Sequence, residues 1–419
     1  MSDDSLFSKI TREVRESVGE ALESAGDHAE RAGRSVLEKA RALRSEIFGQ
    51  HVTAYPAYAY RDAGEPAFWI APMRVWVHDN RDTPGVEEML ERLVVAHFER
   101  DLGKALEPAE AARLEERMAC FIADDKSNEN VEFSFAGDPS GQWFRFAQPT
   151  TANGVIEESI RIPDELVRAL TPNEPTADGS LKIHVRTTDG NGAGEGRIRF
   201  LAPRGLSIVS DIDDTVKITH VPAGKRTVLR NVFIKEWVAA AGMRERYEGL
   251  AAQARAAGED VSFHYISGSP WQLYGLLSEF LIGQEHFPAG TFHMKNLRKN
   301  LLEAGALDSI RAFALGGDLA TLDQKIRQIT NLMIHLPQRQ FILVGDSGEK
   351  DPEVYRAIQR LFPAQVRQII IRDVLGERLA GMELITGPDV PVALDTTEVE
   401  KEMLALVAQA RAEGGQEKL

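Results

Sequence analysis

Three short polar segments contain residue types that could bind a metal ion and carry out nucleophilic catalysis. They are residues 210–215, 267–269 and 345–351, and each follows a run of apolar residues. Such runs predict strands buried on both faces of a mainly parallel sheet, with crossover helices between them. Because ligands of open α/β sheets bind beyond the carboxyl ends of the strands, we expect the three segments to converge.

The acidic residues of these segments predict a site for a hard cation. Packing gives no reason to gather several carboxylates, because buried like charges repel one another. Mg²⁺ prefers a few carboxylate oxygens together with water and phosphate oxygens. Asp211, Asp346 and Asp351 are therefore expected around one ion, and Asp213 is counted among the acids of the metal site.

The pair Asp211 and Asp213 also predicts a division of labour in phosphoryl transfer. Alternate residues of an extended chain point to opposite sides, so one carboxylate can face phosphorus while the other reaches the ester oxygen. A nucleophilic aspartate forms an aspartyl-phosphate, and a second carboxyl group protonates the leaving oxygen and then activates water. Ser267 and a lysine such as Lys325 can bind phosphoryl oxygens, and the lysine also screens the carboxylates.

These residues occur in the order of a known set of motifs. D-x-D-x-T at 211–215, the strand-end Ser267, a lysine on a helix and G-D-x-x-x-x-D at 345–351 resemble the four motifs of the haloacid dehalogenase (HAD) superfamily phosphatases. The resemblance implies Asp211 as nucleophile and Asp213 as acid and base. It also implies that Ser267 and Lys325 bind phosphate and that Asp346 and Asp351 serve the metal side.

A narrower resemblance is to the actin-patch phosphatidate phosphatase family. The segments that carry it are VSDIDDT at 209–215, ISGSPW at 266–271 and VGDSGEKDPEVY at 344–355. The resemblance is strong over about residues 206–375 and weaker upstream, where it rests on Tyr55-Pro56 and the strand containing Trp76. It implies Mg²⁺ as cofactor and phosphatidate as substrate.

The phosphate-binding lysine has competing candidates. The family often has a His-Lys pair where this chain has Gln324-Lys325, and Lys295 and Lys299 lie upstream. We favour Lys325 because the apolar spacing over 326–332 places it on an amphipathic helix just before a predicted strand, which is the position that the resemblance to the HAD superfamily implies for the lysine.

Composition limits the class of protein. The 419 residues contain 64 acidic and 49 basic side chains, a net charge of −15, which argues against nucleic acid as a partner. No apolar run is long enough to span a bilayer, no secretory signal opens the chain, and the single cysteine, Cys120, has no partner for an internal disulfide. We expect a cytoplasmic protein.

The predicted fold class is an α/β HAD-like (Rossmann-like) catalytic domain with a mainly parallel sheet, preceded by a β-sandwich-like domain and a long N-terminal amphipathic helix. The period-two alternation of strands such as 131–135 and 181–186 predicts an antiparallel sandwich, with helical insertions over 85–103 and 107–120. The expected segments are 1–50 helical, 51–203 β-rich, 204–390 catalytic, and 391–419 C-terminal helix and tail.

Two further segments have alternative interpretations. The helix over 5–48 is either a self-associating or domain-covering helix, or one that lies in the plane of a membrane surface. The basic region 217–237 is either a solvated helix face or a small lid that attracts an anionic ester and contacts an acyl chain.

The predicted function is Mg²⁺-dependent hydrolysis of phosphatidate to diacylglycerol and phosphate. The chemistry follows from the residues, whereas the lipid substrate follows from the resemblance alone. The alternatives are a phosphatase of this type that acts on a soluble phosphomonoester, and a non-catalytic module that binds membranes or proteins.

Overall fold

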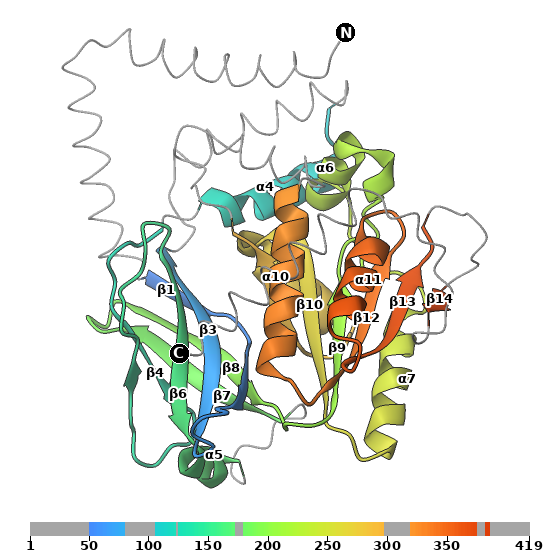
Figure 1. The fold of residues 1–419 in the computed structure, drawn as a ribbon. Coiled ribbons are helices and arrows are strands. Elements are labelled where there is room, and N and C mark those ends of the chain that lie inside the picture. Colours follow the sequence, from blue (N-terminus) through green and yellow to red (C-terminus); the bar gives the residue numbers. More distant parts are fainter. Residues whose placement is uncertain are drawn as a thin grey trace, which may run out of the picture.

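The computed structural model describes residues 50–79, 105–122, 125–171, 179–296, 319–374 and 382–385. The helices predicted over 5–48, 85–103 and 396–412 lie outside these residues, as do Lys299 and the side chain of Cys120. Within the described ranges, no helix combines the length and the apolar composition needed to cross a membrane. The described residues form two β-sheets flanked by helices (Figure 1).

The first sheet has eight strands in the order β1-β3-β2-β8-β7-β4-β5, with β6 paired to β3. The strands are β1 (Gln50–Ala54), β2 (Ala57–Arg61), β3 (Phe68–Asp79), β4 (Val131–Phe135), β5 (Phe144–Arg145), β6 (Val155–Pro163), β7 (Ser180–Thr187) and β8 (Gly192–Phe200). β1 and β2 are the two halves of one strand interrupted at Pro56, whose ring cannot donate a ladder hydrogen bond. Both halves lie between β3 and β8.

The second sheet has six strands in the order β11-β10-β9-β12-β13-β14. They are β9 (Leu206–Asp211), β10 (Val261–Pro270), β11 (Thr291–Lys295), β12 (Gln340–Asp346), β13 (Val366–Arg372) and β14 (Met382–Ile385). The first five run parallel, and β14 pairs antiparallel with β13. The apolar runs at 206–209, 261–266, 341–344 and 369–371 lie in β9, β10, β12 and β13, as the sequence predicts.

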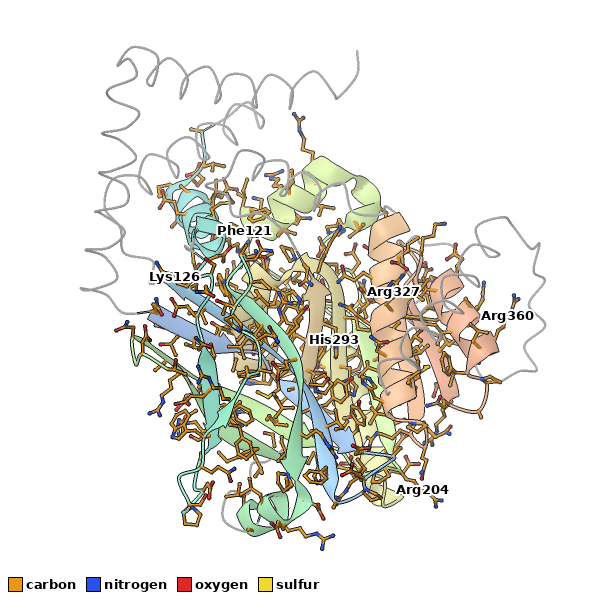
Figure 2. All side chains as sticks on the ribbon, turned by 60° about the vertical axis from the view of Figure 1, so that its left-hand side comes forward. Phe121, Lys126, Arg204, His293, Arg327 and Arg360 are labelled. Atoms are coloured by element: carbon orange, nitrogen blue, oxygen red, sulfur yellow. The ribbon has the colours of Figure 1, made fainter. Side chains whose placement is uncertain are left out.

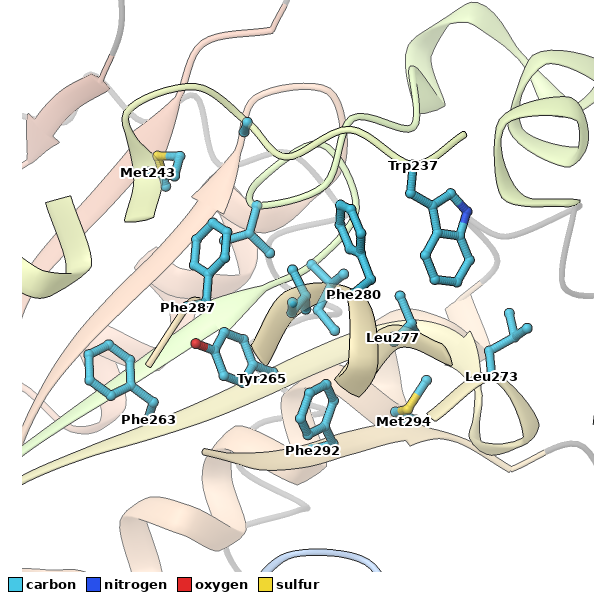
Figure 3. Close-up of a cluster of buried hydrophobic side chains, with 14 of the residues drawn as sticks. Trp237, Met243, Phe263, Tyr265, Leu273, Leu277, Phe280, Phe287, Phe292 and Met294 are labelled. Carbon is cyan, nitrogen blue, oxygen red and sulfur yellow. The ribbon is translucent and has the colours of Figure 1, made fainter. Parts of the chain in front are cut away.

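Helices cover both faces of the second sheet. The helices of the described residues are α4 (Pro108–Ile122), α5 (Asp164–Leu170), α6 (Lys225–Phe233), α7 (Met243–Ala256), α8 (Tyr274–Ser278), α10 (Leu319–His335) and α11 (Asp351–Leu361), with the short turns η1 (Val221–Ala223), η2 (Trp271–Leu273) and η3 (Glu279–Gln284). Ile208 of β9 packs in a cluster with α7 and α8, part of which Figure 3 shows, whereas Val209 packs with α10 and α11. This alternation explains why β9 is apolar on both sides.

Helix α4 lies where the sequence predicts a helical insertion over 107–120, but it packs against the second sheet's helices. Its Arg117 donates to the carbonyl oxygens of Val232 and Lys235, at 2.7 Å each. Leu114 and Met118 of α4 belong to the same apolar cluster as α7. The insertion therefore joins the two halves of the chain in space.

The predicted fold class is wrong. The first sheet is a mixed sheet and not an antiparallel sandwich, because β8 runs parallel to both β1 and β2. Period-two alternation identifies strands but says nothing about which neighbour each strand pairs with, so it could not reveal these parallel pairings. The long N-terminal helix has no counterpart among the described residues. The HAD-like (Rossmann-like) fold class is likewise replaced by the observed topology, an eight-stranded mixed sheet and a six-stranded, mainly parallel sheet.

The two sheets meet through an aromatic and histidine cluster. The Tyr58 hydroxyl of β2 lies 2.7 Å from Nδ1 of His335, and the Tyr58 ring lies edge-on to His264 at 5.6 Å. His293, labelled in Figure 2, lies 6.2 Å from the Tyr58 ring. This cluster buries polar side chains between the sheets.

At the amino ends of the strands, the buried Arg339 ties neighbouring segments together. Its guanidinium donates to the carbonyl of Leu206 at 2.7 Å, to Ser207 Oγ at 2.9 Å and to the Asp260 carboxylate at 2.7 Å. A buried guanidinium is stable only when its donors are paired, and here they hold β9 in register with the segment before β10.

Candidate active site

The carboxyl ends of β9 and β12 bring the predicted acids together. Val344 of β12 pairs with Ser210 of β9, so Asp211 and Asp346 leave the sheet on adjacent strands. Asp351 is the first residue of α11, which starts five residues after β12 ends. Carboxylate oxygens of Asp211, Asp346 and Asp351 lie within 4.8 Å of one another, and all three residues are buried.

Lys325 of α10 is the cation of this cluster. Its Nζ lies 2.9 Å from Asp211 Oδ1 and 3.6 Å from Glu349 Oε2, and it also donates to Asp351. Burial lowers the pKa of Lys325, but the carboxylates of Asp211 and Asp351 outweigh it and hold the pKa well above its usual range. Lys325 therefore screens the carboxylates from one another.

Burial makes the acids of this cluster hard to ionise. It raises the pKa of Asp211 well above its usual range, with Lys325 opposing and Asp351 adding to the shift. Burial together with Asp351 and Glu349 raises the pKa of Asp346 to about 8. Burial also raises the pKa of Glu349 to about 7, although Lys325 opposes it. So much like charge in one buried place favours a further cation.

Two oxygens of the cluster test whether a metal ion fits. Oδ2 of Asp211 and Oδ2 of Asp346 are buried and have no hydrogen-bond partner in the described part of the chain. The other Asp346 oxygen accepts from the backbone N–H of Gly348 at 2.7 Å, which orients the carboxylate. Oriented carboxylates with unpartnered oxygens are the donor set that a hard divalent cation such as Mg²⁺ prefers.

Asp213 lies on the other side of the β9 end, among hydroxyl groups and one lysine. Its Oδ1 accepts from Lys217 Nζ and Thr219 Oγ1, both at 2.7 Å. Its Oδ2 accepts from Ser267 Oγ at 3.1 Å and Ser269 Oγ at 3.2 Å. Burial opposes ionisation of Asp213, but Lys217 and these hydrogen bonds lower its pKa below the usual range.

Ser267 therefore contacts Asp213 in this structure. Its hydroxyl donates to Asp213 and accepts from the backbone N–H of Ser269 at 2.9 Å. Ser267, Lys325 and the four predicted aspartates thus come from β9, β10, α10 and the β12–α11 junction to one end of the second sheet. Of the lysines proposed to bind phosphate, Lys325 forms ion pairs with Asp211 and Asp351, and Lys295 lies at the end of β11.

The turn after β9 is held by a residue that sequence reasoning did not assign. Asp214 has a positive φ of 58°, and its carboxylate accepts from the backbone N–H groups of Thr219, His220 and Val221. Its carbonyl accepts from Arg372 Nη1 at 2.6 Å. These contacts bend the chain after Asp213, as a site with two aspartates of different orientation requires.

Sequence reasoning also missed the partners of Asp213. Lys217 was placed in a basic region that was either solvated or a lid, but its residue is only 1% exposed and its ammonium pairs with Asp213. The spacing of four residues from Asp213 to Lys217 was the available signal. Two apolar residues of this region, Phe233 and Trp237, are buried in the same core cluster as residues of α7, whereas Val228 and Leu229 are only partly buried.

The part of the chain that contains these residues is similar to known proteins. Residues 206–373 match the family model for the catalytic domain of phosphatidate phosphatase APP1. Over 176 residues the chain is 35% identical to phosphatidate phosphatase APP1 of Saccharomyces cerevisiae, covering 41% of this chain and 27% of that protein. An uncharacterized protein of Schizosaccharomyces pombe is 30% identical over 181 residues, covering 43% and 27%. The alignment thus spans only 27% of the length of each relative.

A solved structure of a carbohydrate esterase, described as having divergent catalytic and non-catalytic binding functions, also aligns with the chain. The alignment covers 88% of this chain and 98% of the esterase chain, at 9% identity and a TM-score of 0.19. A score this low defines no shared fold.

Proposed function

We propose that this chain, whose residues 206–373 belong to the family of phosphatidate phosphatase APP1 catalytic domains, is a phosphoric monoester hydrolase that converts phosphatidate to diacylglycerol and phosphate. The observation that carries the proposal is the buried cluster of Asp211, Asp346 and Asp351 around Lys325. Buried carboxylates repel one another unless cations offset their charge, and Lys325 supplies one positive charge for the three aspartates.

In the proposed mechanism Asp211 is the nucleophile. One of its carboxylate oxygens attacks phosphorus while the carboxylate stays beside Lys325, and an aspartyl-phosphate forms as the bond to the leaving oxygen breaks. Asp213 gives a proton to the leaving oxygen. In the second step Asp213 takes a proton from the water that attacks phosphorus, which releases phosphate and restores Asp211.

The surroundings of Asp213 suit the second step. The ammonium of Lys217 and three hydroxyl groups favour the ionised carboxylate, which is the form needed to activate water. Ser267 and Lys325 are proposed to bind the phosphoryl oxygens.

Mg²⁺ is the proposed cofactor, held by Asp211, Asp346 and Asp351 with Asp213 nearby. Bound there, the ion would neutralise charge that develops on the phosphoryl oxygens. The protein contributes the fixed orientation of Asp346, whose Oδ1 is held by Gly348 and Glu349.

The cellular setting stays part of the proposal. We expect a cytoplasmic protein that contacts the membrane peripherally, through residues 1–50 or 217–237, because its proposed substrate is a membrane lipid. Self-association through the N-terminal segment remains the alternative role for residues 1–50.

The test is phosphate release by the full chain from phosphatidate in mixed micelles and from a panel of soluble phosphomonoesters. We expect release from phosphatidate that requires Mg²⁺ and falls at least about 10³-fold in Asp211→Asn. Asp189→Asn, in an exposed turn of the first sheet, is the matched control and keeps full activity.

Three other outcomes of this test would change the proposal. Release confined to soluble esters keeps the mechanism and replaces the substrate. Release that persists in Asp211→Asn shows that the nucleophile is wrong. No Asp211-dependent release from any ester favours the non-catalytic interaction module.

A further inference from the structure

Asp213 accepts hydrogen bonds from donors on two segments of the chain. Lys217 and Thr219, in the turn after β9, each donate to its Oδ1 at 2.7 Å. Ser267 and Ser269, at the end of β10, donate to its Oδ2 at 3.1 and 3.2 Å. Because each oxygen of a carboxylate accepts about two hydrogen bonds, these groups fill the carboxylate. In this arrangement Asp213 has no acceptor position left for the leaving oxygen of an ester.

The proposed reaction, on which this inference rests, requires one of these donors to turn away. Asp213 has to exchange a proton with the leaving oxygen, and Ser267 has to bind a phosphoryl oxygen. A serine hydroxyl has one proton, and Ser267 donates its proton to Asp213. Ser267 therefore cannot donate to Asp213 and to phosphate at once. When it donates to phosphate, one acceptor position on Oδ2 of Asp213 becomes free.

The strand register places Ser267 closer to the reacting phosphorus than Ser269. Ile266 of β10 pairs with Asp211 of β9, so Ser267 is the next residue beyond the partner of the proposed nucleophile. Ser269 lies two residues further along the chain. The backbone N–H of Ser269 donates to Ser267 Oγ at 2.9 Å, which holds that oxygen in place while its proton can rotate toward another acceptor.

The donors to Oδ1 of Asp213 are tied to one another and to α6. Lys217 Nζ donates to Thr219 Oγ1 at 2.6 Å, and Asn231 Nδ2 donates to the carbonyl of Thr219 at 2.8 Å. Lys217 is 1% exposed and Thr219 is fully buried. The proposed reaction draws neither of them away, so the Oδ1 side stays fixed.

Ser269 is then the hydroxyl that still holds Oδ2 once Ser267 donates to phosphate. Ser269 is 2% exposed, so little water reaches its hydroxyl. A carboxylate held at both oxygens keeps its orientation, and its one open acceptor position is the one that Ser267 has left. Proton transfer depends on such fixed geometry between the acid and the leaving oxygen.

We propose that Ser269 is a positioning residue of the reaction, which keeps Oδ2 of Asp213 oriented toward the leaving oxygen while Ser267 binds phosphate. No bond to Ser269 forms or breaks. The proton passes from Asp213 to the leaving oxygen in the first step and from water to Asp213 in the second. The proposal thus divides two neighbouring serines between the phosphate and the acid.

The test is steady-state kinetics of the full chain with Mg²⁺ and phosphatidate in mixed micelles. Ser269→Ala should lower kcat about tenfold or more and change KM less than about twofold, because Asp213 acts on the transition state. Ser267→Ala should instead raise KM about fivefold or more, because it removes a contact with phosphate.

A second substrate, p-nitrophenyl phosphate, separates positioning of the acid from general damage to the site. Its leaving group departs without needing a proton, and kcat/KM reports only the steps up to phosphorylation of Asp211. Ser269→Ala should therefore lower kcat/KM less than about threefold on this ester and about tenfold or more on phosphatidate. If the wild type hydrolyses only phosphatidate, the split between kcat and KM decides.

Ser262→Ala is the matched control. Ser262 also lies in β10, is 1% exposed, and shares hydrogen bonds with Ser207 at 3.0 Å and His264 at 3.1 Å. The variant loses a buried hydroxyl that does not contact Asp213, so its kcat should change less than about twofold.

Two conservative variants of Ser269 test the hydroxyl itself. Ser269→Thr keeps the hydroxyl and should keep kcat within about threefold of the wild type. Ser269→Cys keeps the size but has only a weak donor, so it should lose kcat as Ser269→Ala does, and it decides the matter if the alanine variant does not fold.

Several outcomes would overturn the proposal: an unchanged kcat in Ser269→Ala, a change confined to KM, equal losses on the two esters, or equal losses in Ser269→Ala and Ser262→Ala. A wild type without Asp211-dependent phosphate release refutes the proposed function itself. An active wild type with an equally active Ser269→Ala refutes only the role of Ser269.

Discussion

Asp346 shows at the scale of one residue how the buried acids couple stability to metal binding. Its folded pKa, about 8, lies above the unfolded value, so its contribution favours folding at low pH and is lost as pH rises toward 8. We therefore expect Asp346→Asn to raise the melting temperature of the metal-free protein at pH 8.5 by roughly 3 °C or more. At pH 4 the melting temperatures of Asp346→Asn and of the wild type should be nearly equal.

The same variant tests the metal site. Mg²⁺ should raise the melting temperature of the wild type and have little effect on Asp346→Asn, because a ligand stabilises only the state that binds it. Differential scanning calorimetry with Mg²⁺ and with a chelator measures both effects. A variant that is less stable than the wild type without metal, or that still responds fully to Mg²⁺, would contradict this account.

Lys217 is the residue that holds Asp213 in place. The side chains of Lys217 and Asp213 are 2% and 13% exposed, so Lys217→Met leaves a largely buried carboxylate without its cation. We expect this variant to lose about 3 kcal/mol of unfolding free energy in urea titrations. Lys182→Met is the matched control: its side chain is 38% exposed and that of its partner Glu195 is 56% exposed, so its loss should cost less than about 1 kcal/mol. Similar losses in both variants would remove the special role of Lys217.

At the scale of elements, the junction between β12 and α11 decides the geometry of the acids. Gly345 is the last residue but one of β12, and a Cβ placed on it would lie 2.2 Å from Oδ2 of Asp351, the first residue of α11. Gly345→Ala must therefore push α11 and Asp351 away from Asp346. We expect a loss of about 1–3 kcal/mol of stability and at least a tenfold loss of Mg²⁺-dependent turnover.

Gly249→Ala is the control for this prediction. A Cβ at Gly249, in the interior of α7, meets nothing within 4 Å. The variant should gain up to about 1 kcal/mol from helix propensity and keep its activity. Urea titration and phosphate release measure both variants, and normal turnover in Gly345→Ala would refute the steric argument.

At the scale of the whole molecule, the histidines between the sheets should make stability depend on pH. Burial lowers the pKa of His293 to about 4, and burial together with His293 and Arg339 lowers that of His264 well below its usual range. Since the unfolded chain binds these protons more tightly, stability is complete above about pH 6.5 and falls as pH drops below it.

The difference between the wild type and His293→Gln isolates this effect. We expect the stability of the wild type relative to the variant to fall by at least about 1 kcal/mol between pH 7 and pH 5, in urea titrations with Mg²⁺ present. The raised pKa values of the acidic cluster act in the opposite direction but cancel in the comparison. A difference that is constant or grows on acidification would show that His293 is not held neutral.

Much of the candidate site could be predicted from the sequence, because its residues lie next to strand ends that apolar runs identify. Asp211, Asp346 and Ser267 each follow such a run, and parallel strands bring their carboxyl ends to one edge of a sheet. Lys325 was favoured from helical spacing together with the family resemblance, and in the structure it forms an ion pair with Asp211. The roles of these residues in the reaction stay predictions.

Only the tertiary structure decided how the remaining parts meet. Lys217 looks like a surface lysine in sequence, but in the folded chain it is buried beside Asp213, with its ammonium 5.5 Å from the Trp237 ring. The parallel pairing of β8 with β1 and β2 is nonlocal, so strand periodicity could not specify it. The cavity lined by Tyr55, Arg74, Trp271 and Gln272 is formed by segments about 200 residues apart in the sequence, which local patterns do not connect. The residues proposed to carry out the chemistry lie in short motifs that the sequence reveals directly. The burial of side chains and the pairing of distant strands depend on contacts that form only when the whole chain packs together.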